Sequence, residues 1–308
     1  MATTTSITTT YAGEFAGKYI SAALLSADTI EGGGITIKPN VKYKEVLKTM
    51  SLDAIVADAT CDFSDTSTLT LAEKVLQPEE FQVNLELCKS DFVSDWEAIS
   101  MGYSAFDELP ANFSDYLIGH VAAKVAQKTE QTIWQGANAT AGEFDGFGAL
   151  LAADGDVVDV TGTSVTAANV ITELGKVVDA IPTAVYGKED LYIYVSSNVA
   201  RAYVRALGGF GASGLGANGV NNEGTTWFNG GDLAFDGVKI FVCSGLSDNT
   251  MVAAQKSNLF FGTGLLADHN EVKLLDMADL DGSQNVRVIM RYTASVQIGI
   301  GADIVYYS

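Results

Sequence analysis

The strongest constraint on the fold of this chain is a strict alternation of apolar and polar side chains over residues 81–88, FQVNLELC. This period of two predicts a β-strand, because successive side chains of a strand point to opposite faces. The apolar face of the strand comprises Phe81, Val83, Leu85 and Leu87. Such a face is buried either in the core of its own chain or against another subunit, and the stripe by itself favours the first.

A second, looser alternation at 68–76 precedes this strand. A turn could lie in the Asp- and Thr-rich residues 62–68 or at the break 78–80, so the region predicts an extended two-stranded hairpin over 54–90. A ribbon of two strands is marginally stable in water when it stands alone. The hairpin must therefore lie on other structure, and another subunit would provide it if this chain cannot.

Two further segments favour assembly. Residues 1–10 are almost all Thr, Ser and Ala, which predicts a flexible arm that a partner surface could order; a short helix at 14–25 follows. Residues 208–231 are rich in Gly and Asn and form a loop that is too long for a simple connection. Together with these segments, the apolar stripe of 81–88 is expected to form an inter-subunit interface.

The clearest helix is predicted at 112–135, where apolar residues recur at helical spacing and Gly136 can end the helix. Its length suggests a structural spine. An amphipathic helix is expected at 166–181, a buried strand at 191–195 and a helix at 198–207. Further strands are expected at 238–243, 251–254, 271–275, 285–292 and 294–300. Helices and strands do not alternate regularly, so the expected class is α+β.

Composition excludes several functions. The 308 residues include 38 acidic and only 18 basic side chains, which gives a formal net charge of -20. This charge repels the phosphate backbone and anionic membrane surfaces, so sequence-specific DNA binding and membrane docking are not expected. No apolar run reaches the length of about 18 residues that a membrane span needs. The odd number of cysteines, three, fits a reducing compartment.

No catalytic, cofactor-binding or metal-binding residues are predicted, and the chain is not expected to be an enzyme. Residues 209–214 match G-x-G-x-x-G but follow a predicted helix, where a dinucleotide site would need a preceding strand. His120 and His269 have no nucleophile or carboxylate at a motif spacing. The acidic residues of 276–281 lack the terminal Glu of an oxygen-ligand loop and predict a solvated turn.

The chain resembles the major capsid protein of tailed bacteriophages, which has the Hong Kong 97-type fold. The segments that carry the resemblance are TLTLAEKVLQPEEFQVNLELCKSDF (68–92), DELPANFSDYLIGHVAAKVAQKTEQTIWQG (107–136), LYIYVSSNVARAYVRAL (191–207) and VRVIMRYTASVQIGIGADIVYYS (286–308). These segments extend over nearly the whole chain, and the match rests on their order and local sequence because the fold has no invariant catalytic motif.

The resemblance implies a division of the chain. Residues 1–53 would form an N-terminal arm with a short helix, and 54–90 the extended loop that reaches over a neighbouring subunit. Residues 91–150 and 251–308 would form a peripheral domain with the spine helix, and 151–250 an axial domain. The loop of the axial domain would point to a local five-fold or six-fold axis with the residues Phe210, Asn218 and Asn221.

The function implied is that of a virion shell. The subunits would form hexamers and pentamers and close into an icosahedral phage head around double-stranded DNA, in the cytoplasm of a host bacterium. Expected partners are a separate scaffolding protein, a portal and decoration proteins, with no cofactor. An acidic inner wall would let the genome slide without sequence-specific binding. An encapsulin-like compartment that encloses a cargo enzyme is the alternative.

Overall fold

The computed structural model describes residues 28–52, 67–89, 111–207, 233–264 and 273–308, with six single positions between 55 and 65. The expected mixture of helices and sheets is confirmed. The helices are α1 (Asp28–Glu31), α2 (Ala111–Gln135), α3 (Phe147–Ala153), α4 (Val170–Asp179), α5 (Ser197–Leu207) and α6 (Ala278–Asp281). Within these ranges, no helix has the length and apolar character that would let it cross a membrane.

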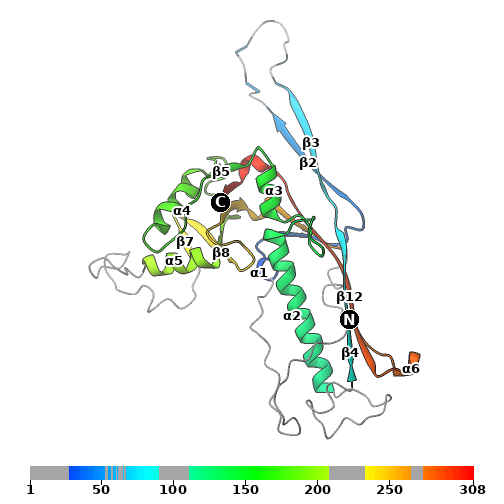
Figure 1. The fold of residues 1–308 in the computed structure, drawn as a ribbon. Helices are drawn as coiled ribbons and strands as arrows, with labels where there is room; N and C mark the ends of the chain where they lie inside the picture. Colours follow the sequence, from blue (N-terminus) through cyan, green and yellow to red (C-terminus); the bar gives the residue numbers. More distant parts are fainter. Residues whose placement is uncertain are drawn as a thin grey trace.

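One sheet has six strands in the order β5-β13-β9-β6-β8-β7 (Figure 1). The strands are β5 (Val158–Val160), β6 (Leu191–Ser196), β7 (Ala234–Phe235), β8 (Val238–Cys243), β9 (Met251–Gln255) and β13 (Val305–Tyr307). On β6, Ile193 and Val195 pack in the core with α4 and α5, whereas Tyr194 faces a second core with Trp134 and Phe147. Burial on both faces explains why this strand is a continuous apolar run.

The second sheet is built around β12 (Asn285–Ile298), a strand of 14 residues. β4 (Glu79–Cys88) pairs with it in antiparallel fashion over ten positions, from Asn285 opposite Cys88 to Ala294 opposite Glu79. The strands β11 (Lys273–Asp276) and β10 (Leu259–Gly262) also pair with β12. β1 (Thr36–Lys38) adds to β10 in parallel.

The helix α2 runs along one face of this sheet (Figure 1). Its apolar stripe packs with apolar residues of β4 and β12 in a common core that comprises Leu117, Val121, Val125, Leu87, Val288 and Met290. The opposite face of the same strands is polar, and there Arg287 Nε lies 2.8 Å from Glu86 Oε2. This arrangement is the apolar-in, polar-out pattern of an antiparallel sheet with one covered face.

A two-stranded hairpin projects from the body of the molecule (Figure 1). It consists of β2 (Glu45–Leu52) and β3 (Leu69–Leu76). The prediction that both strands of the hairpin lie within 54–90 is therefore wrong: β3 pairs with the earlier strand β2, and β4 joins the body. The physical reason is that β12 and α2 offer the apolar side of β4 a long partner strand and a cover within the same chain.

The other predicted elements agree with the structure to different degrees. The helices expected at 112–135 and 198–207 are confirmed as α2 and α5, and α4 forms the central part of the helix expected at 166–181. The two strands expected at 285–292 and 294–300 are one strand, β12, which runs through Thr293 without a break. The arm, the short helix at 14–25, the loop with Phe210, Asn218 and Asn221, and His269 lie outside the described residues.

Candidate assembly interface

The register of the hairpin defines its two faces, because residues directly opposite each other in an antiparallel pair share a face. One face, which we call the apolar face, carries the pairs Val46/Val75, Lys48/Glu73, Met50/Leu71 and Leu52/Leu69. The other, the anchored face, carries the pairs Glu45/Leu76, Leu47/Lys74, Thr49/Ala72 and Ser51/Thr70. Three of the four pairs on the apolar face are therefore hydrophobic, and the fourth brings opposite charges together.

The root of the hairpin is fixed to the body through its anchored face. Leu47 and Leu76 are buried, and a Cβ built on Gly262 of β10 would come within 2.9 Å of the Leu76 side chain. Lys74 Nζ lies 2.5 Å from Asp154 Oδ2, just after α3. Gln297 Nε2 of β12 donates a 2.9 Å hydrogen bond to the backbone oxygen of Val75. These contacts position the projection and leave the apolar face uncovered.

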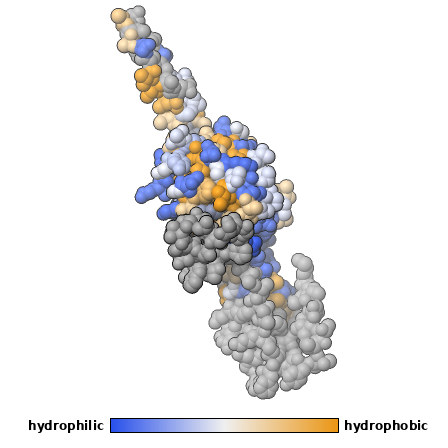
Figure 2. All heavy atoms as spheres, turned by 90° about the vertical axis from the view of Figure 1, so that its left-hand side faces the viewer, coloured by the Kyte–Doolittle hydropathy of each residue, from blue (hydrophilic) through white to orange (hydrophobic). Residues whose placement is uncertain are grey.

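The apolar face is exposed along its whole length. Nine of the sixteen exposed large hydrophobic residues in the described part of the chain lie between 43 and 75: Tyr43, Val46, Met50, Leu52, Ile55, Val56, Leu69, Leu71 and Val75. Figure 2 shows apolar residues along the projecting part of the molecule. Exposed patches of this kind in soluble proteins mark interaction surfaces. The pattern indicates an interaction surface.

The predicted interface stripe has a different location. Phe81, Val83, Leu85 and Leu87 lie on β4, inside the second sheet. The Phe81 ring is 6.0 Å from that of Phe144 and 5.5 Å from that of Tyr292, and Leu87 is buried beneath α2. Leu85 is 38% exposed. The assignment of these residues to the projecting hairpin is wrong because β4 pairs with β12, where Phe81, Val83 and Leu87 pack in the cores of their own chain. Contact of the four residues with another subunit stays a prediction.

A buried polar network ties α1 to α2 beside the first strand of the chain. Thr29 Oγ1 donates a 2.5 Å hydrogen bond to Glu130 Oε1, Thr29 N donates a 3.1 Å bond to Oε2, and Trp134 Nε1 donates a 2.8 Å bond to Thr29 Oγ1. Burial raises the pKa of Glu130, and the hydrogen bonds from Thr29 oppose this shift. The network fixes the start of the described chain against the spine helix.

Other groups with possible chemistry are used structurally. Lys89 is 3% exposed, and its Nζ lies 2.5 Å from Asp276 Oδ2. Asp276, the first residue of the acidic segment 276–281, therefore forms an ion pair with a buried lysine. The cysteines are thiols: Cys243 is buried and burial raises its pKa, whereas Cys61 is exposed. In the part of the chain that the structure describes, no three His, Cys, Asp or Glu side chains converge as a metal site would require.

Comparisons with protein-family models and with curated proteins found no match. Solved structures define the class: the fold is that of phage capsid proteins. The capsid of a native GTA particle matches with a TM-score of 0.64 at 12% identity, over 94% of this chain and 93% of that one. The capsid of Myoviridae Phage XM1 matches with a TM-score of 0.60 at 11% identity, over 96% of both chains.

A structure from Mycobacterium phage Adephagia matches with a TM-score of 0.58 at 17% identity, over 94% of this chain and 91% of that one. The resemblance to phage capsid proteins that the sequence suggests is thus confirmed at the level of the fold, over 94% or more of the chain. At these identities the shared property is the fold, so the role of the hairpin has to be argued from its own geometry.

Proposed function

We propose that this chain is a non-enzymatic shell subunit that forms rings of five and six copies and closes into an icosahedral phage head around double-stranded DNA. The observation that carries the proposal is the hairpin, whose apolar face is exposed on a fold that phage capsid subunits share. Leu71 on this face is 72% exposed. Covering such side chains contributes about 25 cal/mol per Å² of apolar surface, which favours association of copies.

The proposal includes a division into domains. The sheet around β12 with α2 would form the peripheral domain, and the six-stranded sheet with α4 and α5 the axial domain. This division departs from the expected bounds, because β9 and β13 belong to the expected peripheral segment 251–308 but pair within the six-stranded sheet. A scaffolding protein, a portal and decoration proteins are the partners that a phage head of this kind would use. The formal charge of -20 supports enclosure of DNA without contacts to its bases.

Two neighbouring positions of β2 test the role of the apolar face. Met50 lies on the apolar face and Ser51 on the other, and both are exposed. We expect Met50→Asp to abolish rings and closed shells in negative-stain electron microscopy and sedimentation, while Ser51→Asp assembles like the wild type. Both variants should keep the wild-type unfolding midpoint, because surface substitutions change stability by about 0.5 kcal/mol or less. A wild-type chain that stays monomeric under all conditions would overturn the proposal.

The content of the particles separates the phage head from the encapsulin-like alternative. Particles purified from the native source should contain nuclease-resistant double-stranded DNA. A protein cargo in place of DNA would support the alternative, in which the same shell encloses an enzyme.

A further inference from the structure

Two of the connections between the sheets lie side by side. One is the short turn η2 (Lys256–Asn258), which leads from β9 of the six-stranded sheet to β10 of the sheet around β12. The other is the turn at 299–304, which leads from β12 back to β13. β9 pairs with β13, and β10 pairs with β12. An antiparallel pair of strands therefore passes from one sheet into the other and is interrupted at these two turns.

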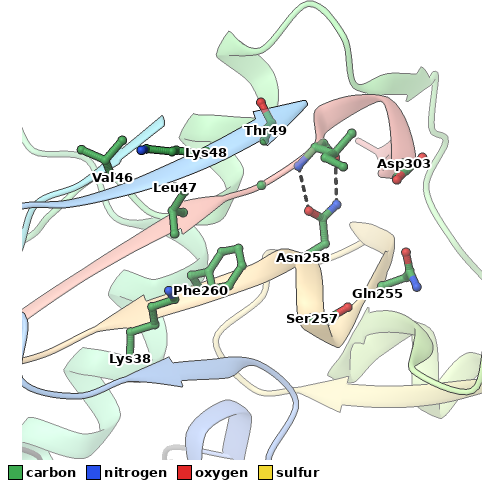
Figure 3. A pocket seen from close by; sticks show the side chains of 12 residues that line it. Lys38, Val46, Leu47, Lys48, Thr49, Gln255, Ser257, Asn258, Phe260 and Asp303 are labelled. Carbon is green, nitrogen blue, oxygen red and sulfur yellow. Dashed lines mark hydrogen bonds between the residues drawn. The ribbon is translucent and has the colours of Figure 1, made fainter. Parts of the chain in front are cut away.

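A single side chain ties the two turns together. Asn258 Nδ2 donates a 2.8 Å hydrogen bond to the backbone oxygen of Ile300, and Asn258 Oδ1 accepts a 2.7 Å bond from the backbone N–H of Ile300 (Figure 3). The backbone N–H of Gly299 donates a 3.0 Å bond to the backbone oxygen of Asn258. We call these three hydrogen bonds the Asn258 clasp.

The clasp replaces the backbone pairing that the two turns interrupt. In an antiparallel ladder, two residues that face each other exchange both of their N–H···O bonds. The side-chain amide of Asn258 carries the same donor and acceptor, and it makes both bonds to one residue, Ile300. The pair of strands is thus held together where its backbone ladder is broken.

The position of the Asn258 side chain depends on a glycine. A Cβ built on Gly299 would lie 2.4 Å from Asn258 Oδ1, which is too short for a carbon and an oxygen that are not bonded. Asn258 is also buried. A buried amide without its partners is unfavourable, so the folded chain keeps the clasp closed.

Packing supports this junction from one side. There, Val252 of β9 and Leu259 of β10 belong to one apolar core with Ile298 of β12. On another side, a groove of about 400 Å³ lies between β2 and the turn at 299–303, and Asn258 is among the residues that line it (Figure 3). Apolar packing has no preferred direction, whereas hydrogen bonds do. The clasp therefore determines the direction in which the two sheets continue.

We infer that Asn258 fixes the angle between the two sheets and, through this angle, the diameter of the shell. The inference rests on the proposed shell function and adds a positioning residue to it. β12 has 14 residues, about 45 Å at about 3.3 Å per residue, so a rotation of about 5° at the junction moves its far end by about 4 Å. Whether a ring of copies closes depends on the rotation between neighbours, which such a movement changes.

The angle can be measured in the subunit before assembly. Ile171→Cys on α4 and Leu280→Cys on α6, near the far end of β12, place two exposed thiols for spin labels on either side of the junction. Cys61→Ser and Cys88→Ser remove the native thiols that are not buried. In pulsed electron paramagnetic resonance, Asn258→Ala should broaden or shift the label-to-label distance by several ångströms. An unchanged distance distribution would overturn the inference.

Asn198→Ala is the matched control. Asn198 Nδ2 donates a 2.9 Å hydrogen bond to Asn249 Oδ1, and Asn198 Oδ1 accepts a 3.1 Å bond from the backbone N–H of Asn249. Both residues belong to the part of the chain that forms the six-stranded sheet. Asn198→Ala should therefore lower the unfolding midpoint about as much as Asn258→Ala but leave the label-to-label distance as in the wild type. An equal change of distance in both variants would also overturn the inference.

The diameter of assembled particles tests the consequence for the shell. In negative-stain electron microscopy, Asn258→Ala should give a shifted or wider distribution of diameters, and Asn198→Ala the wild-type distribution. Gly299→Ala disturbs the clasp without removing Asn258 and should act like Asn258→Ala, and it decides the question if that variant does not fold. Gly155→Ala is its control, because a Cβ there meets no atom within 4 Å. Wild-type diameters in the clasp variants would overturn the inference and leave the shell function standing.

Discussion

At the scale of single residues, Glu130 combines an ionisable group with complete burial. It is a completely buried carboxyl whose pKa is raised by burial, and nearby Asp28 adds to the shift. A group with a raised pKa in the folded state binds more protons there than in the unfolded chain. Its contribution to stability is therefore fully present below its unfolded pKa and is lost as the pH rises through its folded pKa.

We predict that Glu130→Gln flattens this pH dependence. The amide mimics the protonated acid, so the free energy of unfolding of the wild type relative to the variant should be larger at pH 5 than at pH 7.5. The measurement is chemical denaturation at both pH values. Acids such as Glu143 and Asp154, whose pKa values are lowered by hydrogen bonds from lysines, give both chains a pH dependence of the opposite sign. Subtracting the variant's free energy of unfolding from that of the wild type removes this shared pH dependence.

Glu130→Ala provides the control for the hydrogen bonds. It leaves the Thr29 N–H and hydroxyl without their acceptor in a buried place, which should cost about 1–3 kcal/mol at both pH values. An unchanged pH slope in Glu130→Gln would show that Glu130 keeps an ordinary pKa in the folded chain.

At the scale of elements, the sequence predicts strands and helices better than it predicts their partners. Helical spacing locates α2 within one residue, because one face of that helix is apolar over its length. Alternation also identifies β4 as a strand, yet a period of two does not say which strand pairs with it. β2 was not predicted, since its sequence EVLKTMSL places Leu47 among polar residues on one face and Lys48 among apolar residues on the other.

The candidate interface on the hairpin could not be predicted from the sequence for the same reason. Its exposed residues come from two strands that are paired only in the folded chain, and neither strand shows a clean apolar side. The sequence did carry one usable signal. The lysines of 38–48 and the aspartates of 53–68 adjoin each other in a chain with few basic residues, and that contrast marks the two ends of the hairpin.

A pair of leucines on β3 separates stability from assembly. Leu76 is completely buried at the root against Gly262, whereas Leu71 is exposed on the apolar face. We expect Leu76→Ala to lower the free energy of unfolding by about 2–5 kcal/mol, because it removes packed methyl groups from the core. Leu71→Ala should change it by about 0.5 kcal/mol or less and yet reduce assembly. Thermal unfolding and sedimentation of both variants measure the two effects, and equal destabilisation would contradict the described anchoring.

At the scale of the whole molecule, net charge and local contacts act in opposite directions. Every copy carries a formal charge of -20, so copies that approach each other repel over a long range. The contacts on the hairpin act only when side chains touch. Screening separates the two effects, because the Debye length falls from about 30 Å at 0.01 M salt to about 8 Å at 0.15 M.

We therefore predict that the wild-type chain assembles faster at 0.15 M than at 0.01 M salt, as followed by light scattering of purified subunits. Lys188→Glu/Lys239→Glu and Lys44→Glu/Lys48→Glu reach the same net charge from exposed positions, the first pair far from the hairpin root in sequence and the second at it. Added salt should rescue the first variant, since screening removes a general repulsion. It should leave the second defective, because the reversal at Lys48 sets a carboxylate directly opposite Glu73 on the apolar face, and this repulsion acts at short range. Slower wild-type assembly with added salt would instead mean that local attraction outweighs the net repulsion.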